Sequence, residues 1–183
     1  MALITGDVMT FEGNPEVIEN LRRKRKLLRV GSDKAKAIRP AIVYTPGAQG
    51  GARGVAVAKV LLEWGLIATG NHPVVDHLIG TSTGGALVLI TCSRKVEDGA
   101  NVYFKVCTKR AFVSFLRFWQ VQNVEYLERN LRLVLGQLGE GPCAVREFPG
   151  SVHVGVRDQD GRGHLCDAKT ARPDAFALVV AGC

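Results

Sequence analysis

The chain has 183 residues, of which 46% are hydrophobic and 22% are charged, and its formal net charge is +7. This length and apolar content suffice for one domain with a sizeable core. The longest apolar stretches, such as residues 86–91, are far shorter than the roughly 20 residues of a membrane-spanning helix, so no span is predicted. The first residues lack the pattern of a secretory signal. We therefore expect a cytoplasmic protein, with peripheral contact at a membrane surface left open.

The five cysteines are odd in number and widely spaced, and they form none of the CxxC pairs that are typical of zinc or redox sites. We expect reduced thiols with mostly structural roles and no metal site. These residues are Cys92, Cys107, Cys143, Cys166 and Cys183.

The first predicted element is a helix that starts near residue 15. Asn14 can cap it, Pro15 suits its first turn and Gly31 can end it. Its apolar stripe consists of Val17, Ile18, Leu21 and Leu28. A polar link over residues 32–39 follows. Residues 1–40 are therefore predicted as an N-terminal helix and linker that precede a domain over residues 41–183.

Five consecutive basic residues, 22–26, lie on this helix. Such a run can contact nucleic acid or anionic lipid. No aromatic side chains interleave it to stack on bases, so nucleic acid is an unlikely partner. We interpret the run as a solvated helix face, and a steep salt dependence of binding would identify a nucleic-acid role instead.

The next segment alternates strands and helices. Residues 41–44 and 74–79 read as buried strands, residues 55–64 and 85–90 as apolar helices, and residues 46–54 as a glycine-rich loop. Crossovers of this kind are almost always right-handed and connect parallel strands. The segments that follow the two strands should therefore meet at the carboxyl edge of one sheet.

Residues 80–84 have the sequence GTSTG, which is the GxSxG spacing of a nucleophile elbow between a strand and a helix. In such a turn Ser82 has a strained backbone and an exposed hydroxyl. Gly80 and Gly84 leave room for the strand and the helix to approach, and the amide of Thr83 points toward developing negative charge. GxSxG alone is a common pattern, but here a predicted strand precedes it and a predicted helix follows it.

Residues 50–54 have the sequence GGARG, whose backbone could turn several amides toward one point. Alone it would suit a phosphate cradle or a structural turn equally well. It lacks the Lys and Ser/Thr of a P-loop and the full dinucleotide-binding spacing. Because it lies one crossover before Ser82, we interpret it as part of an oxyanion hole.

These motifs together resemble patatin-like phospholipases, in residues 50–55, 60–63 and 79–86, and more faintly in 124–127, 152–167 and 174–183. The resemblance implies an α/β fold, a three-layer α/β/α sandwich with a mainly parallel sheet. It also implies a serine-dependent lipid acyl hydrolase, a phospholipase or esterase, that acts on lipids or small esters through a Ser-Asp dyad. Neither a metal nor another cofactor is implied.

Carried over by position, the resemblance makes Ser82 the nucleophile, and Arg53 matches the arginine in the family's loop. The oxyanion hole would be formed by Gly50, Gly51, Ala52 and the amide of Thr83, and the elbow glycines would be Gly80 and Gly84.

Two departures from the family pattern change the expectation. Gln49 stands where the family usually has a third glycine, so a positive φ at this position would strain it. The dyad aspartate belongs to a DG motif beyond the segment that residues 174–183 resemble, and Asp98-Gly99 and Asp160-Gly161 are out of register with it. The domain is thus predicted to be C-terminally incomplete and a poor hydrolase, unless Asp158, Asp160, Asp167 or Asp174 has been recruited.

Three alternatives remain open. Asp158 or Asp160 with His164 could complete a Ser-Asp-His triad, but we expect these residues in a hairpin away from the carboxyl edge. The chain could also be a catalytically inactive patatin-like remnant that binds lipid or protein. Residues 109–119 combine aromatic and cationic side chains and could face a lipid surface, or fill the core instead.

Overall fold

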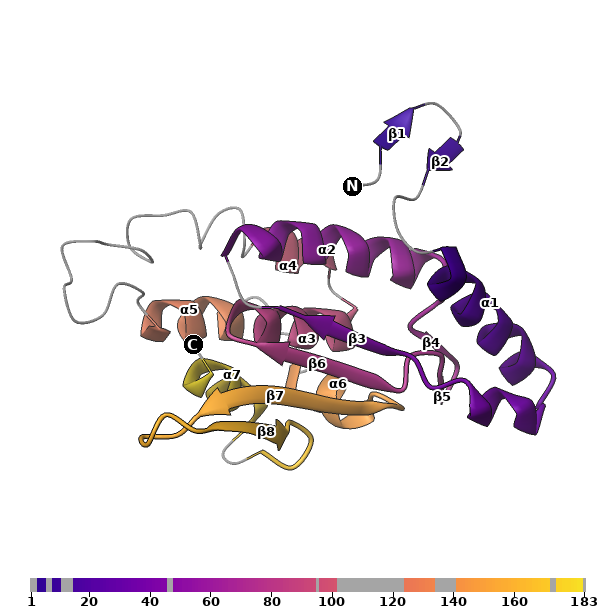
Figure 1. The fold of residues 1–183 in the computed structure, drawn as a ribbon. Coiled ribbons are helices and arrows are strands. Elements are labelled where there is room, and N and C mark those ends of the chain that lie inside the picture. Colours follow the sequence, from indigo (N-terminus) through magenta and orange to yellow (C-terminus); the bar gives the residue numbers. More distant parts are fainter. Residues whose placement is uncertain are drawn as a thin grey trace.

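The computed structural model describes residues 3–5, 8–10, 15–45, 48–94, 96–101, 124–133, 141–171 and 174–182. It has an α/β fold in which a mixed sheet packs against helices (Figure 1). The strands are β1 (Leu3–Thr5), β2 (Val8–Thr10), β3 (Ala41–Tyr44), β4 (Ala68–Thr69), β5 (His72–Pro73), β6 (His77–Thr81), β7 (Ser151–Arg157) and β8 (Gly163–Asp167). The helices are α1 (Pro15–Arg29), η1 (Asp33–Ala37, a 3-10 helix), α2 (Ala48–Glu63), α3 (Thr83–Ser93), α4 (Val96–Asn101), α5 (Val124–Leu131), α6 (Gly141–Glu147) and α7 (Ala175–Ala181).

The main sheet has the strand order β3-β6-β7-β8. β3, β6 and β7 are mutually parallel, and β8 returns antiparallel to β7 as the predicted hairpin. The prediction of parallel strands joined by helical crossovers is confirmed. β6 begins later than predicted and continues through Gly80 and Thr81, so the strand runs up to the residue before Ser82.

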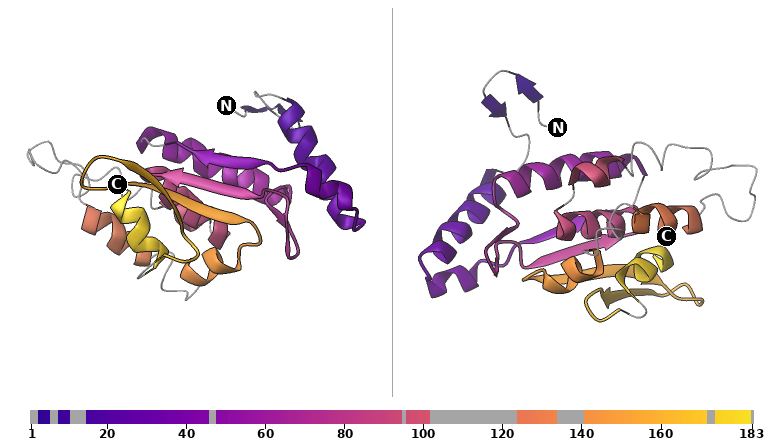
Figure 2. Two further views of the ribbon diagram at one scale, coloured as in Figure 1. Left: turned by 60° about the horizontal axis from the view of Figure 1, so that its bottom comes forward. Right: turned by 180° about the vertical axis from the view of Figure 1, so that it is seen from behind.

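The helices that pack on this sheet lie on one of its faces. Each parallel crossover moves the chain one strand further in the same direction, so right-handed connections place their helices on the same side. Figure 1 looks onto the other face, and the view from behind in Figure 2 shows helices in front of the strands. Side chains on the open face are exposed, with Val43 at 61% and Leu165 at 58%. Among the described residues, helices therefore cover one face of the sheet.

The core lies between this covered face and α3. Leu78, Val152 and Val154 alternate with less buried neighbours along β6 and β7, as strand geometry requires. All residues of α3 are buried, because the helix is enclosed by the sheet, α2, α6 and α7. The Tyr44 hydroxyl lies 2.8 Å from the Thr91 hydroxyl inside this core. Burial raises the pKa of Tyr44 to about 12.

Helix α1 confirms the predicted N-terminal helix, although Asn14 lies outside the described residues. Gly31 ends the helix at a φ of 66°, and the amide of Ser32 donates to the carbonyl of Leu27 at 2.9 Å. This is a Schellman-type ending, which is favoured by glycine. The predicted polar link contains η1, and Leu21 of α1 joins the hydrophobic core.

The interpretation of residues 22–26 as a solvated face is wrong for two of the five side chains, Lys24 and Arg25, whereas Arg22, Arg23 and Lys26 are exposed. Lys24 is 3% exposed and forms an ion pair with Asp76, which directly precedes β6. The Arg25 guanidinium donates to the carbonyl of Trp64 at 2.6 Å, and Arg22 lies 5.5 Å above the Trp64 ring. The basic run thus attaches α1 to the rest of the fold, because a buried charge requires a partner.

Candidate active site

Ser82 forms the turn between β6 and α3. Its backbone has φ 55° and ψ −127°, which lies outside the helical, extended and left-handed regions that non-glycine residues occupy. Such a conformation costs of order 1–3 kcal/mol and persists only where the surrounding structure imposes it. The strand-to-helix geometry that the GxSxG pattern predicts is therefore present at this serine.

Close packing around two glycines imposes the turn. A Cβ on Gly80 would lie 2.2 Å from the carbonyl oxygen of Gly84, and a Cβ on Gly84 would lie 2.1 Å from that of Tyr44. Neither approach leaves room for a side chain. The end of β3 and the end of β6 thus both lie against the first turn of α3, which holds Ser82 at the carboxyl edge of the sheet.

The Ser82 hydroxyl is not used to stabilise this turn. Ser82 occupies the N-cap position of α3, where a serine side chain ordinarily accepts a hydrogen bond from a first-turn amide, but it makes no such bond. Its carbonyl accepts from the amide of Gly85 at 2.8 Å. Among the described residues, no side chain is hydrogen-bonded to the hydroxyl, which lies at the positive end of the α3 dipole.

The glycine-rich segment 50–54 is helical in the structure, and its prediction as a loop is wrong. Gly50, Gly51, Ala52 and the exposed Arg53 all lie in the first turns of α2, which begins at Ala48. Gln49 also lies in α2, where φ is negative, so the strain expected at this residue is not found.

The helical geometry of α2 changes which backbone amides of residues 50–52 are available to an oxyanion. First-turn amides, including that of Gly50, lack carbonyl partners within a helix, whereas the amide of Ala52 reaches the carbonyl of Ala48. α2 follows β3 and α3 follows β6, and the two strands are parallel neighbours. The N-termini of both helices therefore lie at the carboxyl edge that carries Ser82.

The β7–β8 hairpin turn lies at this same edge, which corrects the expectation that it lies elsewhere. β7 runs parallel to β6, with Thr81 opposite Gly155, and continues beyond it to Arg157. Across the hairpin, the Nε2 atom of His164, on β8, lies 2.7 Å from the Asp158 carboxylate. Hydrogen bonds from His164 and from the amide of Arg162 hold the pKa of Asp158 below its ordinary value.

Two further candidate carboxylates, Asp174 and Asp167, also have other partners. Asp174 accepts from the Arg132 guanidinium at 2.8 and 3.1 Å and from the amide of Ala177. Burial opposes ionisation of Asp174, but these hydrogen bonds outweigh it and lower its pKa. Asp167 accepts from the amide of Lys169, and Asp98 lies exposed on α4. Within the described part of the chain, none of these carboxylates is hydrogen-bonded to Ser82.

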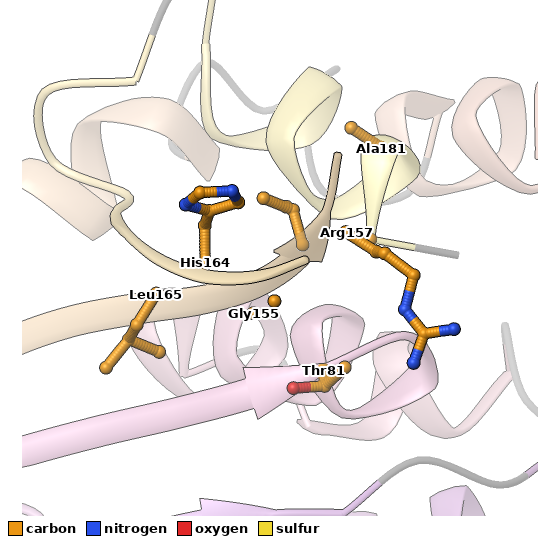
Figure 3. A pocket seen from close by; sticks show the side chains of 9 residues that line it. Thr81, Gly155, Arg157, His164, Leu165 and Ala181 are labelled. Atoms are coloured by element: carbon orange, nitrogen blue, oxygen red, sulfur yellow. The ribbon is translucent and has the colours of Figure 1, made fainter. Parts of the chain in front are cut away.

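A pocket of about 570 Å³ opens next to the Ser82 turn. Its walls come from the ends of β6 and β7, from β8 and from the end of α7 (Figure 3). They are formed by Thr81, Gly155, Val156, Arg157, Gly163, His164, Leu165, Ala181 and Gly182. Thr81 connects the pocket to Ser82 along the chain. His164 is a candidate from the sequence alone, whereas Arg157 is not, since no motif contains this arginine.

The cysteines and the possibility of a metal site can be examined in the described residues. Cys92 is buried, and this burial raises its pKa to about 12, which disfavours the thiolate form that acts as a nucleophile. Cys166 is a free, half-buried thiol on β8. Among the described residues, no three His, Cys, Asp or Glu side chains gather to hold a metal ion. Cys107, Cys183 and residues 109–119 lie outside the described residues.

Two searches with the whole chain add no relative: no protein-family model and no curated protein matches it. In the structure, none of the described helices is both long enough and apolar enough to cross a membrane.

Proposed function

We propose that the chain is a serine acyl hydrolase of the patatin-like type, with Ser82 as its nucleophile and a lipid or small ester as its substrate. One observation carries the proposal: Ser82 has a strained backbone at a strand-to-helix turn, and its hydroxyl does not serve as a helix cap. Strain of this size is otherwise unfavourable, and strained residues cluster where a side chain must be presented to a ligand. The GxSxG sequence supplies the same residue independently.

In the proposed reaction, the Ser82 oxygen adds to the ester carbonyl carbon while its proton leaves to a base. Collapse of the tetrahedral intermediate expels the alcohol, which takes up a proton, and leaves an acyl-serine. Water then adds to this ester, releases the acid and regenerates the serine. Amides in the first turns of α3 and α2, among them those of Thr83 and Gly50, would stabilise the oxyanion.

The lack of a hydrogen-bonded base beside Ser82 limits the rate of the proposed reaction. General-base assistance typically contributes about 10² to 10⁴-fold, and no described carboxylate is hydrogen-bonded to Ser82. We therefore propose slow turnover by this chain. The same observation favours the second candidate function, a patatin-like protein without catalysis that binds lipid or protein through the same pocket. We also propose the three-layer arrangement of the patatin-like fold, in which helices would cover the face of the sheet that is open in Figure 1.

Turnover of p-nitrophenyl esters by the wild-type chain and by Ser82→Ala tests the assignment. We expect slow, saturable release of p-nitrophenol that disappears in the variant, while circular dichroism and the unfolding midpoint show a retained fold. Equal turnover by the two proteins would reject Ser82 as the nucleophile. Absence of turnover in both, with ligand binding retained, would favour the non-catalytic alternative.

A further inference from the structure

The end of strand β7 brings an arginine next to the Ser82 turn. Thr81, the last residue of β6, pairs with Gly155, and β7 continues for two more residues to Arg157. Arg157 therefore lies beyond the end of β6, at the level where the chain turns at Ser82. Thr81 and Arg157 line the same pocket, and Figure 3 shows the arginine side chain extending from β7 on the side of Thr81.

The charge of this arginine is not neutralised by the described residues. Arg157 is exposed, and none of the described carboxylates pairs with it. The contrast with other charged groups is clear, because Arg132 is paired with Asp174 and Glu128, and His164 with Asp158. Among the residues that line the pocket, none is acidic. The positive end of the α3 dipole at Ser82 adds to the favourable potential for an anion.

The other walls of the pocket are suited to hydrocarbon. Val156, Leu165 and Ala181 are apolar, and three glycines contribute backbone without side chains. Leu165 is 58% exposed and lies across the pocket from Arg157 in Figure 3, which leaves apolar surface available in the same pocket as the arginine. The pocket thus offers a guanidinium, which binds phosphate or carboxylate oxygens with two parallel hydrogen bonds, next to an apolar surface.

We propose that Arg157 is the specificity-determining residue of this site, and that it makes the pocket select acyl esters that carry an anionic phosphate or carboxylate group near the ester bond. The inference rests on the proposed function of Ser82, because the pocket matters for specificity only if an ester is presented to this serine. Arg157 contacts the anionic group, and the apolar walls contact the adjoining hydrocarbon.

Binding to Ser82→Ala protein tests the selectivity without any turnover. We would titrate this protein by calorimetry with a short-chain monoacylglycerol phosphate and with the neutral monoacylglycerol of the same chain length, below their critical micelle concentrations. A partly exposed charge-assisted pair contributes about tenfold in affinity, so we expect the phosphate ester to bind about tenfold more tightly. Adding Arg157→Gln should reduce this preference, measured as the ratio of the two affinities in the same protein, to below about twofold, since the guanidinium is lost.

Arg162→Gln provides a matched control, because Arg162 is an exposed arginine in the same hairpin that does not line the pocket. This variant should keep the full preference, and Arg157→Lys should keep part of it. Equal affinity for the two ligands, or a preference that survives Arg157→Gln, would overturn the inference. Inorganic phosphate that displaces the ligand as effectively as the acyl phosphate would show a free-anion site and would also overturn it. If the wild-type chain shows no ester turnover, that result counts against the proposed function and not against the role of Arg157. The binding measurements do not depend on catalysis.

Discussion

The amino and carboxyl ends of the parallel strands differ in whether selected polar side chains have partners within the protein. At the amino end, two basic side chains of α1 have partners in the fold: Lys24 is buried against Asp76, and Arg25 donates to the carbonyl of Trp64. At the carboxyl end, Ser82 has a strained backbone, and neither its hydroxyl nor the Arg157 guanidinium has a partner among the described residues. The two partnered groups at the amino end stabilise the fold. At the carboxyl end His164 and Asp158 pair with each other, whereas Ser82 and Arg157 remain available to a ligand.

This difference separates two kinds of mutational effect. A change at the amino end should cost stability and leave the chemistry of Ser82 unaltered. A change at the Ser82 turn should remove reactivity, and relieving its strain should increase stability, as is common where a strained site serves a function. The following variants test whether the two regions can be separated in this way.

The largest effect on stability is expected for Gly84→Ala, because the new methyl group would lie 2.1 Å from the carbonyl oxygen of Tyr44. A backbone atom cannot move aside as a side chain can, so we expect a loss of about 3 kcal/mol in the free energy of unfolding. Urea denaturation would measure it. Gly163→Ala is the matched control, since nothing lies within 4 Å of a Cβ at this position. A similar loss in both variants would contradict the close packing of the elbow.

Asp76→Asn should destabilise the amino end by about 2 kcal/mol, because it leaves the Lys24 ammonium buried without its counter-charge. Reactivity of Ser82 should be unchanged once the fraction of folded protein is accounted for. The control is Asp33→Asn, whose carboxylate pairs with Lys36 in full exposure, so no measurable change is expected. If Asp76→Asn abolished Ser82 reactivity in fully folded protein, the two ends would not be separable.

A smaller effect of opposite sign is expected for Ser82→Gly. Glycine tolerates the backbone conformation of this turn, so stability should rise by about 1–2 kcal/mol while reactivity is lost. Arg94 provides a comparison at the other end of α3, where its φ of 57° is an ordinary left-handed helix ending. Arg94→Gly should stabilise by about 0.5 kcal/mol without loss of reactivity. A destabilised Ser82→Gly protein would contradict the strain at this turn.

The features that could be predicted from the sequence are those that depend on short-range patterns. Apolar residues 41–44, followed one crossover later by a strand leading into GxSxG, are sufficient to indicate parallel strands and the turn at Ser82. The need for glycine at residue 80 is local, because a Cβ there would lie 2.2 Å from the carbonyl oxygen of Gly84, whereas the close approach of Gly84 is to Tyr44 on β3. The ending of α1 at Gly31 is equally local.

The features that could not be predicted depend on partners distant in sequence. Lys24 looks like part of a solvated run until Asp76, which is 52 residues away, comes to lie beside it. Residues 50–54 have the composition of a loop, but the α2 helix starts before them. The hairpin turn at residues 158–162 reaches the Ser82 edge only because β7 is inserted parallel to β6, and Arg157 enters the pocket for the same reason.

Labelling with a fluorophosphonate tests the central claim, the nucleophilicity of Ser82, most directly. The reagent forms a covalent phosphonyl ester with an activated serine and releases fluoride, so slow ester turnover does not obscure the result. Intact-mass and peptide analysis should show one adduct per chain, located at Ser82, and no adduct in Ser82→Ala or in heat-unfolded protein. An adduct on another residue that persists in Ser82→Ala, or folded wild-type protein that resists labelling as completely as the variant does, would contradict the account.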